Sequence, residues 1–327
     1  MINGTTTLNY LLRPVDALMG APQVTEIVCQ QPGEVGFEQA GKWHWRDVPE
    51  FDYRRLDAIG LLAGSLLSKR FDPAAPICLT TLPGGQRASI VRPPTVAPGT
   101  ISLTIRIPSK QVHTVHDAGF ADLMREAETR MDRVDPVDAE LLRLYRAEDW
   151  RAFFSLAVKA RKTIAATGAT GSGKTTLLRR LGREIPPEER LVTIEDTAEF
   201  GDLPIRNRVS LFYGAAGVTA EEAVETSLRL RPDRIMLQEL RGAEAFAFLR
   251  ALAAGHPGSL STWHSSEGEW WVPLSLMAKQ HPAGREIPDD KLDRIVRNLI
   301  DIVAHCVRDQ NGFRISSVYF RTAELAS

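Results

Sequence analysis

The sequence predicts an α/β protein of two domains: a larger C-terminal domain built on a parallel sheet and a smaller α+β N-terminal domain. The chain's 327 residues exceed what one hydrophobic core usually supports. Its second half alternates apolar strand-like runs with helical segments, a pattern typical of a parallel sheet covered on both faces. The stretch Gly168-Ala-Thr-Gly-Ser-Gly-Lys-Thr175 has the G-x-x-x-x-G-K-[ST] spacing of a phosphate-binding loop.

Short elements of both kinds are predicted in the first hundred residues. They are a helix at 5–20 interrupted near Arg13-Pro14, strands at 25–29 and 36–45, a helix from Asp52 to about Leu67, a hairpin of 77–82 and 87–91, and a strand at 101–107. In the helix after Asp52, apolar residues at 56, 59, 63, 66 and 67 recur at helical spacing, which predicts packing on the sheet. We expect these elements to form an α+β domain over residues 1–108.

A charged, helical segment follows at 109–150 and is predicted to be an interdomain linker. One helix is expected at 117–130, and Asp135-Pro136 marks a break before a second helix. The linker decides whether the N-terminal domain sits on its own C-terminal domain or on that of a neighbour. The sequence leaves both arrangements open.

The glycine-rich stretch has the context that a phosphate loop requires. An apolar run at 163–167 leads in as a strand, and 175–181 leads out as a helix whose N-terminus adds partial positive charge. Lys174 is predicted to reach the β- and γ-phosphates of ATP, and the Thr175 hydroxyl to ligate Mg²⁺. The weaker alternative is a glycine-rich turn with an incidental lysine. The predicted nucleotide-contacting residues are Gly168, Ala169, Thr170, Gly171, Ser172, Gly173, Lys174, Thr175 and Thr176.

Three further strands of the C-terminal half are expected to end in chemically active side chains. The run 191–196 ends in Glu195 and Asp196, 234–239 ends in Glu239, and 259–264 ends in His264, with helices at about 219–230 and 242–254 between them. Because the carboxyl ends of parallel strands meet at one edge of a sheet, these side chains should converge on the nucleotide.

Hydrolysis of a γ-phosphate needs a metal, a positioned water and compensating positive charge. Glu239 is the candidate to orient and deprotonate the water. Glu195 and Asp196 are candidates to hold Mg²⁺ through its water shell, since Mg²⁺ keeps several waters. His264 could bond the γ-phosphate or the Glu239 carboxylate, and Arg241 is the nearby arginine expected to face the site. Acids at strand ends also serve as helix caps or ion-pair partners, so a structural role stays possible for each of Glu195, Asp196 and Glu239.

Composition narrows the class of partners and the compartment. The formal net charge of −1 gives no general attraction to nucleic acid, and no sequence-specific nucleic-acid binding is expected. Cys29, Cys78 and Cys306 are distant and odd in number, so neither a disulfide framework nor a zinc site is indicated. The longest mainly apolar run, 59–67, is too short to span a bilayer. We therefore expect a cytoplasmic protein whose membrane association, if any, is peripheral.

The order of these motifs resembles the secretion ATPase superfamily, and more narrowly the VirB11 traffic ATPases of bacterial type IV secretion. The matching segments are the phosphate loop, 194–196, 230–234, 239–244 and 255–264, with 84–87, 91–94 and 102–106 upstream and 297–303 near the end. Two departures stand out: Gln238 replaces a residue that is usually small, and Trp263 one that is usually aliphatic. The segment 265–285 matches poorly, and no role is assigned there.

The resemblance implies a RecA-like P-loop domain at 151–327 that uses ATP and Mg²⁺. It implies a homohexameric ring at the cytoplasmic face of the inner membrane, working with other type IV secretion components. Glu195 then corresponds to an acid box, Glu239 to a Walker B glutamate and His264 to a histidine box. Arg87 and Arg106, which would otherwise be solvated edge charges, become catalytic groups near the phosphates.

Two other functions are compatible with the same motifs. A type IV pilus or type II secretion ATPase shares the same core, although the Gly255-His-Pro-Gly258 segment and the missing cysteine-pair zinc module favour type IV secretion. A nucleotide-gated scaffold with little turnover would carry the same binding motif.

Overall fold

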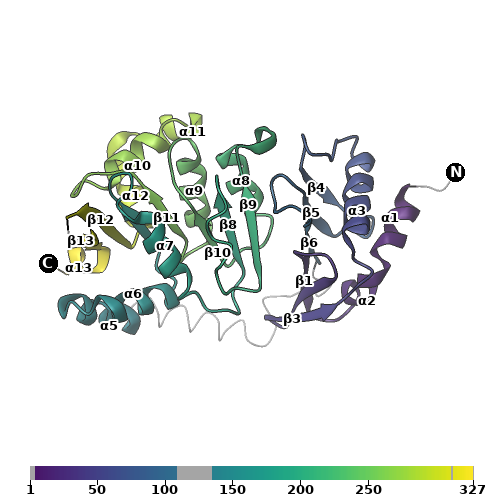
Figure 1. Cartoon of the computed structure of the whole chain (residues 1–327), viewed down its shortest axis with the longest axis horizontal. Coiled ribbons are helices and arrows are strands. Elements are labelled where there is room, and N and C mark those ends of the chain that lie inside the picture. The colour runs from purple at the N-terminus through teal and green to yellow at the C-terminus, as the bar shows by residue number, and fades with distance from the viewer. Residues whose placement is uncertain (1–3, 109–134, 311, 327) are drawn as a thin grey trace, which may run out of the picture.

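The computed structural model describes residues 4–108, 135–310 and 312–326 and contains two sheets, one in each half of the chain (Figure 1). The predicted helix at 117–130 lies outside the described residues. All three cysteines are buried and unpaired.

The N-terminal half forms a six-stranded antiparallel sheet with helices packed against it. Its strands are β1 (Val24–Cys29), β2 (Glu34–Gln39), β3 (Lys42–Asp47), β4 (Ile77–Thr81), β5 (Arg87–Val91) and β6 (Ser102–Arg106), in the order β3-β2-β1-β6-β5-β4. Its helices are α1 (Gly4–Leu12), the 3₁₀ turn η1 (Arg13–Val15), α2 (Asp16–Met19) and α3 (Tyr53–Leu66). Asp52 caps α3 by accepting a hydrogen bond from the Arg55 amide at 2.7 Å. The predicted helix break near Arg13-Pro14 and the predicted hairpin are confirmed.

Two expectations for this half are wrong in detail. The strand expected at 36–45 is a hairpin, because Ala40 and Gly41 have φ values of 50° and 75° and turn the chain between β2 and β3. Leu66 and Leu67 are 46% and 41% exposed rather than packed on the sheet, because α3 ends at Leu66.

The C-terminal half is built on a seven-stranded sheet. Its strands are β7 (Ile164–Thr167), β8 (Leu191–Glu195), β9 (Arg208–Phe212), β10 (Arg234–Leu237), β11 (Leu260–Trp263), β12 (Ile302–Asp309) and β13 (Gly312–Phe320), in the order β13-β12-β7-β11-β10-β8-β9. The six strands from β12 to β9 are parallel, and β13 is antiparallel to β12. The predicted parallel sheet is confirmed. The sequence pattern did not predict strand β9 or the β12–β13 hairpin.

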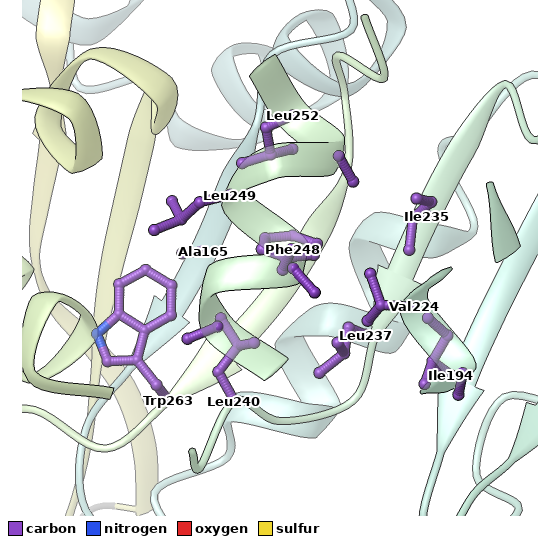
Figure 2. Packing of buried hydrophobic residues seen from close by; sticks show 14 of the residues in the cluster. Ala165, Ile194, Val224, Ile235, Leu237, Leu240, Phe248, Leu249, Leu252 and Trp263 are labelled. Atoms are coloured by element: carbon purple, nitrogen blue, oxygen red, sulfur yellow. The ribbon is translucent and has the colours of Figure 1, made fainter. Parts of the chain in front are cut away.

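Helices cover both faces of this sheet. They are α5 (Pro136–Arg146), α6 (Trp150–Lys159), α7 (Lys174–Gly182), α8 (Ala220–Ser227), α9 (Glu244–Ala253), α10 (Trp271–Ala278), α11 (Pro282–Arg285), α12 (Asp289–Leu299) and α13 (Arg321–Leu325), with a 3₁₀ turn η2 (Ala215–Gly217). Alternate strand residues point to opposite faces. Ile235 and Leu237 thus pack with α8 and α9, as Figure 2 shows, whereas Met236 packs with α6 and α7.

The described end of the predicted linker is part of the C-terminal core. Asp135 caps α5 by accepting a bond from the Val137 amide, and Pro136 occupies the first turn, as the predicted break requires. Leu141 and Leu144 of α5 are buried in the same cluster as Phe153 of α6. The helix pair α5–α6 therefore packs on the sheet rather than spanning a gap.

The two halves meet beside β9, the outermost strand on that side of the C-terminal sheet. The Phe212 amide donates to the Thr95 carbonyl at 2.7 Å. Arg190 is fully buried there and donates to the Leu230 carbonyl at 2.6 Å and to the Thr104 hydroxyl at 3.1 Å. Burial lowers the pKa of Arg190 to about 10. Three strands separate this contact from β7 and the loop that follows it.

Candidate functional site

The glycine-rich stretch connects β7 to α7 as predicted. Gly168, Gly171 and Gly173 have φ values of 133°, 71° and 91°, a region that side chains rarely allow. A Cβ at Gly168 would lie 2.1 Å from the Cys306 carbonyl oxygen, so this position also needs the close backbone approach that glycine permits. Helix α7 starts at Lys174, directly after the loop.

A cavity of about 690 Å³ opens at the carboxyl edge of the sheet, which is the size of a small-molecule site. Its walls are the loop residues 170–176 together with Asp196, Glu199, Gln238, Glu239, Arg241, His264 and Phe313. The predicted convergence of Asp196, Glu239 and His264 on the phosphate loop is therefore what the structure shows.

Lys174 is held by its own loop. Its Nζ donates to the carbonyl oxygens of Gly168 and Ala169 at 3.0 and 2.9 Å, and its side chain is nearly buried. Burial lowers the pKa of Lys174, and the nearby Glu239 carboxylate opposes that shift. The ammonium group therefore sits at the loop centre with ligands that a phosphate can replace.

A chain of polar contacts links Lys174 to the ends of the other strands. The His264 Nδ1 lies 3.3 Å from the Lys174 Nζ, and its Nε2 lies 2.9 Å from the Glu239 Oε1. When Nε2–H donates to Glu239, the neutral ring accepts from Lys174 through Nδ1. Arg241 donates to Glu239 at 2.6 Å and to Asp196 at 2.8 Å, so the arginine expected at the site does face it.

These bonds also shift the pKa of Arg241. Burial disfavours its positive charge, but the bonds and charges of Glu239 and Asp196 outweigh burial and raise the pKa of Arg241. The guanidinium thus connects Asp196, after β8, with Glu239, after β10, and both carboxylates line the cavity.

Glu195 occupies a different place from its neighbour. It is 1% exposed and does not line the cavity, because it is the last residue of β8 and points into the protein. Its carboxylate accepts from the Thr193 hydroxyl at 2.5 Å and from the amides of Glu199 and Phe200 at 2.7 and 3.0 Å. These contacts indicate that Glu195 holds in position the turn that carries Asp196. The predicted role of Glu195 in catalysis and metal binding would require these bonds to rearrange, and it stays a prediction.

Gln238, one of the two departures from the family pattern, ties two strand ends together. It is 6% exposed, and its Oε1 accepts from the Asp196 amide at 2.9 Å. The Thr262 hydroxyl donates to the Gln238 carbonyl at 2.8 Å, which adds β11 to the connection. Sequence reasoning missed this role, since the bond joins residues 42 positions apart.

Trp263, the second departure, leaves His264 in place. Its side chain is fully buried in the core, as Figure 2 shows, and its Nε1 donates to the Trp270 carbonyl at 3.0 Å. Successive strand residues point in opposite directions, so the bulk of Trp263 turns inward while His264 faces the cavity.

Arg87 and Arg106 lie together, but in another cavity of about 460 Å³. They are directly opposed on β5 and β6, and Arg106 lies 3.6 Å from the buried Glu26 of β1. Burial raises the pKa of Glu26 to about 7, although Arg106 opposes the shift. We call this cavity the arginine cleft; its opposite wall, from the C-terminal domain, includes Arg229 and Arg231. Within the described chain no phosphate-loop residue lines it.

The phosphate-loop cavity fits the predicted nucleotide and metal. The Ser172 hydroxyl is buried and has no hydrogen-bond partner among the described residues. Thr175 and Asp196 line the cavity together with Lys174. The described residues contain no cluster of three or more His, Cys, Asp or Glu side chains suited to a metal. Nucleotide sites hold Mg²⁺ through one or two carboxylates and the phosphates themselves, so Thr175 and Asp196 are the lining residues that would hold it.

In the described part of the chain, no helix has the length and apolar character needed to cross a bilayer.

Comparisons with known proteins point in one direction. A family model described as "Type II/IV secretion system protein" matches residues 127–278. The type IV secretion system protein VirB11 of Brucella suis is 36% identical over 330 aligned residues, covering 98% of this chain and 91% of that protein. The type IV secretion system protein PtlH of Bordetella pertussis is 37% identical over 306 residues, covering 91% of this chain and 89% of its own.

The structural comparison agrees with the sequence comparison. The crystal structure of the Brucella suis VirB11 ATPase in complex with sulphate matches with a TM-score of 0.92 at 36% identity, covering 99% of this chain and 98% of that one. The predicted fold class, a RecA-like P-loop domain with a smaller α+β domain, is confirmed.

Proposed function

Because the chain belongs to the VirB11 family of type IV secretion ATPases, we propose that it hydrolyses ATP with Mg²⁺ to power assembly of, or substrate transfer through, a bacterial type IV secretion system. The observation that supports hydrolysis rather than binding alone is the connection of Lys174 to Glu239 through His264, over 3.3 and 2.9 Å. This geometry joins a phosphate-binding cation to a candidate general base.

Binding of the triphosphate follows from the loop. Lys174 exchanges the carbonyls of Gly168 and Ala169 for β- and γ-phosphate oxygens, and the N-terminus of α7 adds its partial positive charge. Bound Mg²⁺ would supply positive charge against the negative charge that develops on the transferred phosphate. Thr175 and Asp196, which line the cavity, would hold it, and Glu195 binds the amides of the turn that follows Asp196.

Glu239 is the residue we assign to the attacking water. Its carboxylate is aimed by His264 on one oxygen and by Arg241 on the other. His264 contacts both Lys174 and Glu239, so a change at the phosphate end reaches the base through a single ring. This makes His264 a candidate sensor of the γ-phosphate.

The arginine cleft supports an assembly of several copies. Arg87 and Arg106 have no phosphate loop of their own chain in the cleft that they line, so an incoming phosphate group would come from another copy. We propose a homohexameric ring in which these arginines face the nucleotide of a neighbour. An arginine supplied in trans can accelerate phosphoryl transfer by about 10³–10⁵. The ring would sit at the cytoplasmic face of the inner membrane with other secretion components.

Lys174→Ala tests the proposal. Wild-type protein is expected to bind ATP, to release phosphate, and to show a native mass of six copies with ATP. Lys174→Ala is expected to lose both binding and hydrolysis, whereas Lys159→Ala on the exposed end of α6 should behave as wild type. If wild-type protein binds ATP tightly but releases phosphate no faster than Lys174→Ala, the result would instead favour a nucleotide-gated scaffold.

A further inference from the structure

The β12–β13 hairpin overhangs the phosphate loop. Strand β12 runs parallel to β7, with His305 opposite Thr167, the last residue of β7. Beyond that point β7 gives way to the loop, while β12 continues to Asp309 and β13 returns from Gly312. The closeness of the Cys306 carbonyl to Gly168 shows that hairpin and loop touch through their backbones.

Phe313 is the hairpin residue that reaches the nucleotide cavity. It lines the same cavity as Lys174 and Thr175. Its side chain borders Gly173, with the Cδ1 atom only 3.2 Å and the Cβ atom 3.5 Å from where a Cβ at that glycine would be. Even so, Phe313 is 62% exposed, which leaves most of this large apolar ring uncovered in the single chain.

Arg308 pairs with Phe313 across the two strands. The two residues are direct partners in the β12–β13 ladder, and the guanidinium carbon lies 5.0 Å from the ring centroid. A cation over an aromatic face restrains that ring. Hairpin pairing and the cation–π contact thus hold the exposed ring at a defined place beside the start of α7.

The rest of the cavity explains what such a ring could do. Among the described residues lining it, Phe313 is the one phenylalanine, tyrosine or tryptophan; the others supply amides, hydroxyls and charges suited to phosphate and metal. A nucleotide whose phosphates lie at the N-terminus of α7 must extend its base away from Lys174. Gly173, which the Phe313 side chain borders, immediately precedes α7.

We propose that Phe313, restrained by Arg308, is the surface on which the base of the bound nucleotide stacks, so that the β12–β13 hairpin contributes base affinity to a site whose loop recognises only phosphates. This inference rests on the proposed nucleotide site and adds a recognition residue to it. Aromatic rings stack on every base, so the contact favours nucleotides over free polyphosphates more than it distinguishes one base from another.

The test separates base binding from phosphate binding. Dissociation constants for ATP, ADP and inorganic tripolyphosphate are measured by calorimetry for the wild-type chain and for Phe313→Leu and Phe313→Ala. The leucine variant keeps an apolar side chain beside Gly173 but has no aromatic face. We expect ATP and ADP to bind about tenfold more weakly to both variants and tripolyphosphate to bind as to wild type, while Phe313→Tyr keeps wild-type nucleotide affinity.

Two controls make the outcomes distinct. Leu325→Ala removes another strongly exposed apolar side chain and should change no dissociation constant. Lys174→Ala should weaken ATP and tripolyphosphate alike. Equal affinities in Phe313→Leu and wild type, or an equal loss for ATP and tripolyphosphate, would overturn the stacking assignment while leaving the nucleotide site intact. If wild type binds neither ATP nor tripolyphosphate, the proposed function itself fails.

Discussion

The phosphate-loop cavity and the arginine cleft are both polar, yet only the first holds cations and carboxylates in similar number. The phosphate-loop cavity is lined by Lys174 and Arg241 and by the carboxylates of Asp196, Glu199 and Glu239, and His264 lies between Lys174 and Glu239. In the arginine cleft, the buried Glu26 faces a surplus of cations, which are Lys69, Arg87, Arg106, Arg229 and Arg231.

In the proposed mechanism, this difference separates a site that one chain completes from a site that needs a second chain. Apart from Glu199, the charged groups of the first cavity are connected to one another, so they are already oriented before a substrate arrives, which is the condition for electrostatic catalysis. In the cleft, Arg231 is paired with Glu38 and Asp233, and Arg106 lies near Glu26. Among the described residues no carboxylate forms an ion pair with the remaining cations, Lys69, Arg87 and Arg229, so this part of the cleft is suited to an anion brought from outside. The charges of the two cavities thus support the proposal that a single chain supplies the nucleotide site and that the arginine cleft acts on a neighbour.

Glu239→Gln changes the phosphate-loop cavity most directly. Among the variants discussed here, we expect it to reduce the rate of phosphate release the most. An amide cannot accept a proton from water and loses the charge that holds Arg241, so phosphate release should fall by about 10²-fold or more. The dissociation constant for ATP should stay within a few-fold, because the loop and Lys174 are unchanged. Phosphate release and calorimetric binding measure the two quantities.

Glu225→Gln is a matched control, because Glu225 is an exposed acid on α8 that does not line the phosphate-loop cavity. It should retain wild-type turnover. If Glu239→Gln also retains it, Glu239 has no part in the mechanism, and the balance of the cavity serves binding alone.

The parts of the fold that sequence predicts well are those with a strong local signal. Asp52 before α3 and Pro136 at the start of α5 mark helix starts, and the apolar runs at β7, β8 and β10 mark buried parallel strands. β9 alternates buried and half-exposed residues over only five positions, and β12 becomes exposed along its length, so neither gives a continuous pattern.

Predictability of the site follows the same division. Asp196, Glu239 and His264 follow from one topological rule, that parallel strands present their carboxyl ends at one edge. The roles of Gln238 and Phe313 depend on contacts between segments far apart in the chain, which no local pattern encodes. The burial of Glu195 likewise depends on which way the last residue of β8 points.

Arg106→Ala tests whether the arginine cleft acts on the nucleotide of its own chain or on that of a neighbouring chain. We expect hydrolysis to fall at least about tenfold, since positive charge near the transferred phosphate is lost. If the arginine acts on a neighbour, mixing Arg106→Ala with Lys174→Ala subunits restores turnover above that of either variant alone. In such mixed rings an intact loop on one subunit meets an intact arginine from the next.

The N-terminal domain should remain folded in Arg106→Ala, because that side chain is 60% exposed. Unchanged melting by circular dichroism checks this. Arg70→Ala, at an arginine paired on the surface with Asp72, should neither slow hydrolysis nor complement Lys174→Ala. Unchanged turnover in Arg106→Ala would return Arg106 to a solvated edge charge, and slow turnover without complementation would place its action within one chain.

Glu26→Gln is expected to have the smallest effect of these variants. It tests whether Glu26, the carboxylic acid of the arginine cleft, makes the stability of the protein depend on pH. Burial raises the pKa of Glu26 from 4.5 to about 7 in the folded chain, so the folded state holds a proton that the unfolded state releases. Wild-type stability from this group is therefore full below pH 4.5 and declines as the pH rises through about 7. A glutamine cannot ionise and escapes this loss.

We accordingly expect the Tm of Glu26→Gln to exceed that of wild type by a few degrees at pH 8 and by clearly less at pH 5, measured by calorimetry against an exposed control, Glu50→Gln. An equal difference at both pH values would mean that Glu26 ionises like an ordinary carboxylate. The cleft would then be closer to charge balance near neutral pH than its burial implies. The expected result instead means that protonation of Glu26 leaves the arginines still less compensated, which strengthens their attraction for a neighbour's phosphates.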